Sequence, residues 1–464
     1  MKLQLIFRWL AGAATATFLA LCLPTTAFSQ ESHEASPLTL KQAVTIALEK
    51  NPQRKATLAD TKTAAADVRQ ARSFFLPHVT FSETATRGND PVYVFGSKLR
   101  QRRFTTGDFA LNFLNTPTPL NNYSTRFGGT WNLFDSLASW HGVNRAEREK
   151  DAAEHLLERA DQEVVFGVVN AYEGELLAKK ELEVAEQATK TAQAILDRSK
   201  TRVESGVAVE SDLLNAQVRL ATRKQELIRA QNNLSLARAE LARAMGISTD
   251  KDTEPAGTLV EHSLPEKSLD ELEKKALESR PDLKGIQSEE AAQRQSVAIA
   301  KSSFGPRVNA FADWEADNPT FVSGGGGNNW MAGIEVRMDL FQGGARRAKL
   351  QHEQAMQEKV AALKEAARDA IRLEVRRAYY DLDTARQQVE VAKAAIAQAQ
   401  ESLRITQNRY ESGVSTITDL LSAEEAASRS QADYWETVCR YQTTYANLEL
   451  ATGILNAQSP VVMP

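Results

Sequence analysis

Two copies of one unit follow each other along this chain. ALEKNP at 47–52 corresponds to ALESRP at 276–281, and VESGVAVESDLLNA at 203–216 corresponds to YESGVSTITDLLSA at 410–423. The first pair is 276 − 47 = 229 residues apart and the second is 410 − 203 = 207 residues apart. The first copy therefore carries 229 − 207 = 22 extra residues, which fall within 78–130. A duplication of this kind constrains the fold strongly, because both copies have to form the same local structure and pack together.

The first 29 residues have the pattern of a secretory signal peptide. Lys2 and Arg8 precede an apolar run, and the small residues Ala27 and Ser29 favour cleavage after Ser29. Cys22 follows Leu21 rather than a small residue, which argues against lipid attachment. We therefore expect a signal peptide at 1–29, a first repeat at 30–250 and a second repeat at 251–464. The mature chain keeps one cysteine, Cys439, so no internal disulfide is possible.

Each copy begins with a short amphipathic helix and continues into a strand hairpin. In the first copy the helix at 40–50 ends at Asn51, a good N-cap for a second helix that begins at Pro52. Apolar residues then alternate with polar ones, which is typical of strands with two different faces. The predicted hairpins cover about 78–134 and 307–341, and each strand is long enough, at about 9–11 residues, to cross a bilayer at a tilt. We expect the hairpin loops at 88–121 and 317–328.

Long helices follow each hairpin and then turn back. The stretches 137–203 and 345–410 contain no proline, and at 1.5 Å per residue each helix would be about 100 Å long. Apolar residues recur at heptad spacing, which predicts supercoiling against neighbouring helices. A return helix at about 210–245 and the helix at 52–75 together match the long helix in length, so we expect them to stack end to end beside it. The long and return helices would cover about 137–245 and 345–452.

Four strands per chain cannot cross a membrane alone, because an open sheet leaves backbone groups unpaired in hydrocarbon. Two chains would give a filled eight-stranded barrel, whereas three chains give twelve strands and room for a channel. The expected fold class is therefore mainly α with a membrane β-barrel portion. It combines a long coiled-coil α-helical barrel with four β-strands per chain, and a trimer shares the 12-stranded barrel.

Two motif pairs are characteristic: the two turn sequences at 202–216 and 409–423, and FGSKL at 95–99 with FTTGDF at 104–109. Through these motifs the chain resembles the TolC-like outer-membrane efflux proteins over essentially its whole mature length. The resemblance implies a homotrimeric exit duct for efflux or type I secretion, which is not an enzyme. It also implies a place in the outer membrane of a Gram-negative bacterium, a long periplasmic part, and docking with a periplasmic adaptor protein and an inner-membrane transporter.

The resemblance also assigns candidate site residues at the two turns. Asp212 and Asp419 match acidic residues of the pore constriction, and Tyr410 matches a tyrosine that helps to latch it. Ser415 stands where the family example has a basic latch residue. The turn residues that match the adaptor-binding tip are Ser205, Gly206, Val207, Ser412, Gly413 and Val414. Both aspartates begin a helix, so helix capping is an equally strong interpretation.

Other functions find little support in the composition. The net charge of −4 and the scattered basic residues do not indicate nucleic-acid binding. The six histidines lack metal-ligand spacing, and Gly324–Gly327 has no surrounding strand and helix to make a phosphate cradle. We therefore expect no cofactor, no metal and no catalytic residue. The alternatives are a periplasmic adaptor, which would need one helical hairpin and compact β-domains, and a coiled-coil scaffold without a pore.

Overall fold

Equivalent capping signals start the two halves of the computed structural model, which describes residues 38–250, 254–259, 268–321 and 327–463. Helix α1 (Leu40–Lys50) ends at Asn51, whose side chain accepts the backbone N–H groups of Gln53 and Arg54 at the start of α2 (Pro52–Ser73). Helix α7 (Leu269–Ser279) is followed in the same order by α8 (Pro281–Ser302), where Arg280 takes the place of Asn51 but makes no side-chain cap. The predicted capping role of Asn51 is confirmed. The predicted signal peptide lies outside the described residues.

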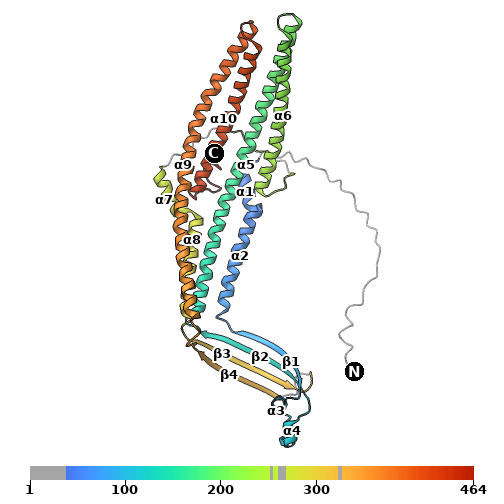
Figure 1. Cartoon of the computed structure of the whole chain (residues 1–464), viewed down its shortest axis with the longest axis vertical. Helices are drawn as coiled ribbons and strands as arrows, with labels where there is room; N and C mark the ends of the chain where they lie inside the picture. Colours follow the sequence, from blue (N-terminus) through green and yellow to red (C-terminus); the bar gives the residue numbers. More distant parts are fainter. Residues whose placement is uncertain (1–37, 251–253, 260–267, 322–326, 464) are drawn as a thin grey trace, which may run out of the picture. The chain divides into compact units, whose positions relative to one another are not determined.

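Two helices of 67 residues each, α5 (Ala138–Glu204) and α9 (Ala345–Glu411), are the longest elements. Each turns back into a shorter helix, α6 (Glu210–Met245) or α10 (Ile417–Ala451). Gly206 and Gly413 occupy these turns at φ angles of +73° and +74°, which favour glycine because it lacks a Cβ. Helices α5 and α6 run side by side, and so do α9 and α10 (Figure 1).

The shorter helices stack end to end beside the long ones, as predicted. Helices α2 and α6 both pack along α5, and α8 and α10 both pack along α9. At the first joint the Asn51 Nδ2 donates to the carbonyl of Ala244 at 3.0 Å, and a Cβ on Gly246 would lie 2.6 Å from the Asn51 Cα. At the second joint a Cβ on Gly453 would lie 2.8 Å from the Arg280 Cα. Helices α8 and α10 also contact α5, which joins the two copies into one bundle.

The main core lies where α1 crosses the bundle. Its fully buried members include Val44 of α1, Val168 and Val169 of α5, Leu241 of α6 and Val438 of α10. A smaller core under α7 joins it to α9, and a third lies between the helices near the two turns. Burial of these side chains supplies most of the bundle's stability, at about 1.5–3 kcal/mol for each large aliphatic residue.

All four strands form one antiparallel sheet in the order β1-β2-β3-β4. The strands are β1 (His78–Gly88), β2 (Leu120–Phe134), β3 (Arg307–Asn318) and β4 (Gly327–Arg337). The prediction that the fourth strand reaches 341 is wrong, because β3 begins after Pro306 and its first residue, Arg307, pairs with Arg337. Within the described chain, residues beyond Arg337 therefore have no partner in β3.

The sheet has two chemically different faces. Phe81, Phe127, Trp314 and Trp330 form one row across the four strands, and Ser82, Arg126, Glu315 and Asn329 form the next row. Because neighbouring residues of a strand point to opposite sides, these rows define an apolar face and a polar face. Trp330 is 80% exposed and Val79 is 75% exposed, so the apolar face is uncovered in the single chain.

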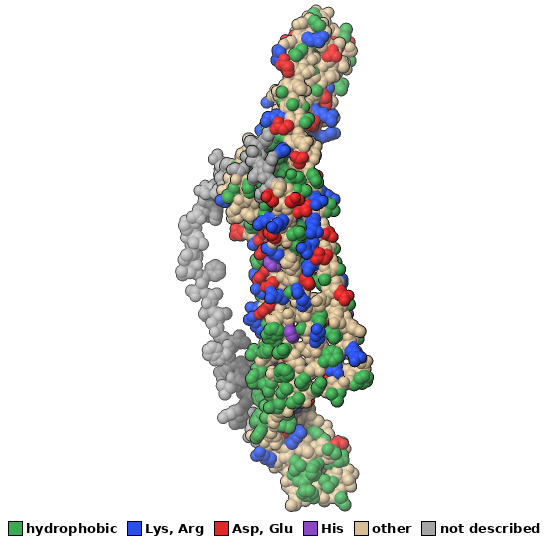
Figure 2. Space-filling view, turned by 90° about the vertical axis from the view of Figure 1, so that its left-hand side faces the viewer, with side chains coloured by type: hydrophobic (Ala, Val, Ile, Leu, Met, Phe, Trp, Pro, Cys, Tyr) green, Lys and Arg blue, Asp and Glu red, His purple; other side chains and the backbone are tan. Residues whose placement is uncertain are grey.

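Hydrophobic side chains also gather where the helices meet the sheet. Figure 2 shows this cluster next to a helical surface dominated by Lys, Arg, Asp and Glu. The connecting segments and helix ends also carry exposed apolar residues: Phe74, Phe75, Leu76, Phe134, Leu137, Trp140, Leu340 and Phe341. The surface therefore changes from charged to apolar at the junction between helices and sheet.

The segment between β1 and β2 is more ordered than the loop predicted at 88–121. It contains helix α3 (Pro91–Arg100), the 3-10 helix η1 (Thr106–Phe109) and helix α4 (Leu111–Asn115). Asp90 caps α3 by accepting the backbone N–H of Tyr93 at 2.8 Å, and Pro91 is the first helical residue. This combination is a strong helix-start signal.

Candidate functional site at the helical turns

The predicted tip residues lie at the ends of α5 and α9, at the opposite end of α5 from the sheet. In the first turn the backbone N–H of Val207 donates to the carbonyl of Arg202, and in the second Val414 donates to Arg409, both at 2.8 Å. Val207 and Val414 are 66% and 67% exposed. The two turns therefore present the same backbone loop and the same apolar side chain to the surroundings.

Asp419 is a helix cap in this structure. Its carboxylate accepts the Thr416 backbone N–H at 3.0 Å and the Thr416 hydroxyl at 2.8 Å, and the Ser415 hydroxyl lies at 3.2 Å. The hydrogen bonds from Thr416 lower the pKa of Asp419, so the exposed side chain stays ionised. Asp212 lies in the first turn of α6, where its charge complements the helix dipole. The capping interpretation is confirmed for Asp419, while the predicted pore role of both aspartates remains untested.

Tyr410 is buried between the two helical pairs, with 5% of its surface exposed. The Arg202 guanidinium lies over its ring at 5.0 Å, and Arg202 Nη1 donates to the carbonyls of Tyr410 at 3.2 Å and Glu411 at 3.4 Å. The Tyr410 hydroxyl has no hydrogen-bond partner within the part of the chain that the structure describes. Arg202 therefore holds the end of α9 against α5 through both charge and ring contact.

A second set of ion pairs connects the same helical pairs further from the turns. Arg198 Nη1 lies 2.7 Å from the Glu411 carboxylate, and Arg219 of α6 pairs with Glu425 of α10. The Arg223 side chain is 5% exposed and contacts the Glu424 side chain, 3% exposed, at 3.0 Å. The free-energy cost of burying the Arg223 and Glu424 charges is offset by their mutual attraction only while both side chains are present.

These arginines were not singled out by the sequence interpretation. Arg202 stands in the turn motif at the same place as Arg409, and the two motifs differ at the next residue, which is Val203 in the first and Tyr410 in the second. Only the packing of the first copy against the second brings Arg202 next to Tyr410. A buried ion pair leaves one signal in a sequence, which is a charged residue on the apolar face of a helix. Arg223 is such a residue, because it lies at helical spacing between Leu220 and Leu227.

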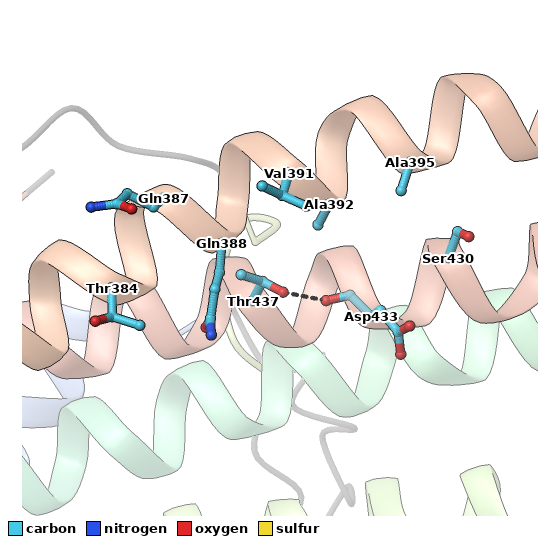
Figure 3. A pocket seen from close by; sticks show the side chains of 9 residues that line it. All are labelled: Thr384, Gln387, Gln388, Val391, Ala392, Ala395, Ser430, Asp433 and Thr437. Atoms are coloured by element: carbon cyan, nitrogen blue, oxygen red, sulfur yellow. Dashed lines mark hydrogen bonds between the residues drawn. The ribbon is translucent and has the colours of Figure 1, made fainter.

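A shallow groove of about 500 Å³ runs between α9 and α10. Figure 3 shows Thr384, Gln387 and Gln388 of α9 facing the groove, with Asp433 and Thr437 on α10. The Thr437 hydroxyl donates to the backbone carbonyl of Asp433 at 2.5 Å, which satisfies it within its own helix. The lining is open and mixes polar side chains with Val391, Ala392 and Ala395, and it holds no acid–base pair, so the groove offers a contact surface rather than a reaction site.

Two common kinds of site, a metal-ligand cluster and a membrane-spanning helix, also bear on the class of protein. Within 38–250, 254–259, 268–321 and 327–463 no group of three or more His, Cys, Asp and Glu side chains is placed to hold a metal ion. No helix in those same ranges is both apolar and long enough to span a membrane.

Comparison with known proteins decides the family. The model of the family described as outer membrane efflux protein matches residues 43–247 and 272–454. This chain belongs to the outer membrane efflux protein family. The family consists of channels rather than enzymes. The match covers both copies of the repeat and both turns.

Relatives of this outer membrane efflux protein include secretion and efflux components. It is 27% identical to Protein CyaE of Bordetella pertussis, over 83% of this chain and 78% of CyaE. It is 24% identical to the alkaline protease secretion protein AprF of Pseudomonas aeruginosa, over 98% and 90% of the two chains. The solved structure of the Campylobacter jejuni CmeC outer membrane channel has the same fold, with a TM-score of 0.76, 17% identity, and 97% and 95% of the chains covered.

Proposed function

We propose that three copies of this chain form an exit duct for efflux or type I secretion across the outer membrane. The observation that carries the proposal is the sheet, which has an uncovered apolar face, a polar face and two unpaired edges. Joining three such sheets edge to edge gives twelve strands and removes every edge. The apolar face then meets lipid and the polar face lines the channel. Proteins named for secretion, such as AprF, are consistent with this role.

The helical bundle extends into the periplasm in this proposal. Residues 1–29 are the signal peptide, and the two repeats at 30–250 and 251–464 contribute equivalent helical pairs to the wall of the duct. Ser205, Gly206 and Val207, with Ser412, Gly413 and Val414, form the contact for a periplasmic adaptor, which connects the duct to an inner-membrane pump. Their exposed backbone loops and valines support this assignment.

The constriction of the duct lies at the same end. Asp212, Asp419 and Tyr410 are its candidate residues, and three copies gather six carboxylates around the axis. A ring of carboxylates attracts cations and repels anions. Tyr410 is buried and held by Arg202 across the two helical pairs, which supports a latch at this position.

Cross-linking in membranes and conductance in planar bilayers test the proposal. We expect cross-linking to saturate at a trimer and the purified trimer to form cation-preferring channels. Saturation at dimer, or monomer alone, would contradict the shared barrel. A stable trimer that never conducts would instead favour a scaffold without a pore.

A further inference from the structure

The segment between β1 and β2, residues 89–119, contains the 22 residues that the second copy lacks. Gln101, which directly follows α3 within this segment, binds to the edge of the sheet. Gln101 Nε2 donates to Asn122 Oδ1 at 2.8 Å and to the carbonyl of Asn121 at 2.9 Å, and Asn122 Nδ2 donates to Asp317 Oδ1 at 2.6 Å. Gln101, Asn122 and Asp317 are 3%, 7% and 0% exposed, so these bonds form a buried polar anchor. We call residues 89–119 the insertion segment.

The anchor lies on the polar face of the sheet. Asp317 pairs with Ser124 and Glu315 pairs with Arg126. Both pairs lie on one face because they are two positions apart along each strand. Asn122 comes two residues before Ser124 and belongs to the same face. Arg100 Nη1 also reaches Glu315 Oε1, at 3.4 Å.

Gly327 gives an independent indication of the same placement. It is the first residue of β4 and pairs with Asp317, so a side chain there would point from the polar face. A Cβ built on Gly327 would lie 1.7 Å from the carbonyl oxygen of Arg100. The backbone at the end of α3 therefore rests directly on the polar face, and only glycine leaves room for it.

The insertion segment is packed well enough to hold a fixed position. Phe104 contacts Phe95 and Phe109 edge to face, at centroid distances of 4.8 and 5.1 Å. Lys98 Nζ lies 2.5 Å from Asp108, and the hydrogen bonds from Lys98 and Thr105 lower the pKa of Asp108 to about 2. Aromatic contacts and a charge-assisted bond favour one conformation over a mobile loop.

We infer that the insertion segment is a fixed constriction at the outer mouth of the duct, which limits the size of solutes that enter from outside. The inference rests on the proposed function, because the polar face lines the channel only in the closed barrel. Three copies then project from the polar faces toward one axis. The second hairpin lacks these 22 residues in its sequence, so the inferred constriction has one such segment per chain.

Polymer exclusion in planar bilayers tests the inference on the full-length trimer. Polyethylene glycols of increasing size are added to the side that carries the sheet, where a polymer that enters the mouth lowers the conductance. One variant replaces 91–119 with a short Gly-Ser linker. A second, Gly327→Ala, only displaces the Arg100 carbonyl, and so remains informative if the deletion does not fold. Gly129→Ala in β2 is the matched control, because its Cβ meets atoms no closer than 3.7 Å.

We expect the deletion and Gly327→Ala to admit larger polymers from the sheet side than the parent and Gly129→Ala do. The exclusion size measured from the opposite side should stay the same in all four proteins. If the deletion, or Gly327→Ala where the deletion does not fold, keeps the parent's exclusion size from the sheet side, the insertion segment does not narrow the mouth. A parent protein that forms no channels at all would instead overturn the proposed function together with the inference.

Discussion

Removing the Arg202 side chain should loosen the closed state of the duct. Arg202 makes a charged hydrogen bond of 3.2 Å to the Tyr410 carbonyl and lies over the Tyr410 ring at 5.0 Å. A hydrogen bond from a charged group contributes about 1.5–3 kcal/mol and a cation–π contact at a partly exposed site about 0.5–1 kcal/mol. If opening separates α5 from the end of α9, Arg202→Ala destabilises the closed state by about 2–4 kcal/mol. At 1.4 kcal/mol per factor of ten, the ratio of open to closed channels rises about 30- to 700-fold for each copy.

Single-channel recording in planar bilayers measures this ratio directly. Arg409→Ala is the matched control, because Arg409 occupies the equivalent place in the second turn and is exposed. Tyr410→Phe separates two contributions, since it keeps the ring under Arg202 and removes only the hydroxyl. If the buried hydroxyl contributes to the closed state, we expect Tyr410→Phe to raise the conductance. An Arg202→Ala channel that opens no more often than Arg409→Ala would refute the assignment of Arg202 as the clamp.

Three further predictions concern buried and acidic side chains. Arg223→Met leaves the Glu424 charge buried alone and should lower the free energy of unfolding by about 3–5 kcal/mol, whereas adding Glu424→Leu should restore most of the loss. Denaturant titration measures both variants. A larger loss in the double variant than in Arg223→Met would contradict the reasoning. Burial raises the pKa of Glu173 to about 7. The carboxyl of Glu173 therefore loses its proton at a lower pH in the unfolded chain than in the folded one. Its contribution to the free energy of unfolding is largest below about pH 4.5, and about 3 kcal/mol of it is lost as the pH rises to about 7. Thermal melts of Glu173→Gln over this pH range should show a smaller loss of stability. Asp212→Ala combined with Asp419→Ala should weaken cation preference in reversal-potential measurements, and an unchanged preference would leave both residues as helix caps alone.

The sequence predicts the helical pairs and strands well because their signals are local and repeated. Heptads at Leu213, Leu220 and Leu227 and the capping signal at Asn51 each act within a few residues. The end of β4 was overestimated because the alternation continues to Leu340, while strand length depends on a partner that begins only after Pro306. Helix α3 was missed although Asp90 and Pro91 mark its start, because its apolar residues resemble those of a loop at a barrel mouth.

The candidate site is harder to predict because its contacts join the two copies. Arg202 and Arg409 stand in nearly identical motifs, yet only Arg202 meets the buried ring of Tyr410. The first copy has Val203 at the place that corresponds to Tyr410, so the reciprocal contact cannot form. The asymmetry comes from a single aromatic residue, and its importance becomes visible only when the two halves are packed together.

The joints between the stacked helices give the bundle a mechanical property. Helix α5 is continuous, whereas α2 and α6 beside it are separate helices that meet where Gly246 contacts Asn51. Only non-covalent contacts hold the two helices in line at this point. Helix α6 has 36 residues and is therefore about 54 Å long. A tilt of about 5° at the joint moves the far end of such a lever by about 5 Å. A small change of angle near the middle of the molecule, where α1 packs, therefore becomes a larger displacement at the turns.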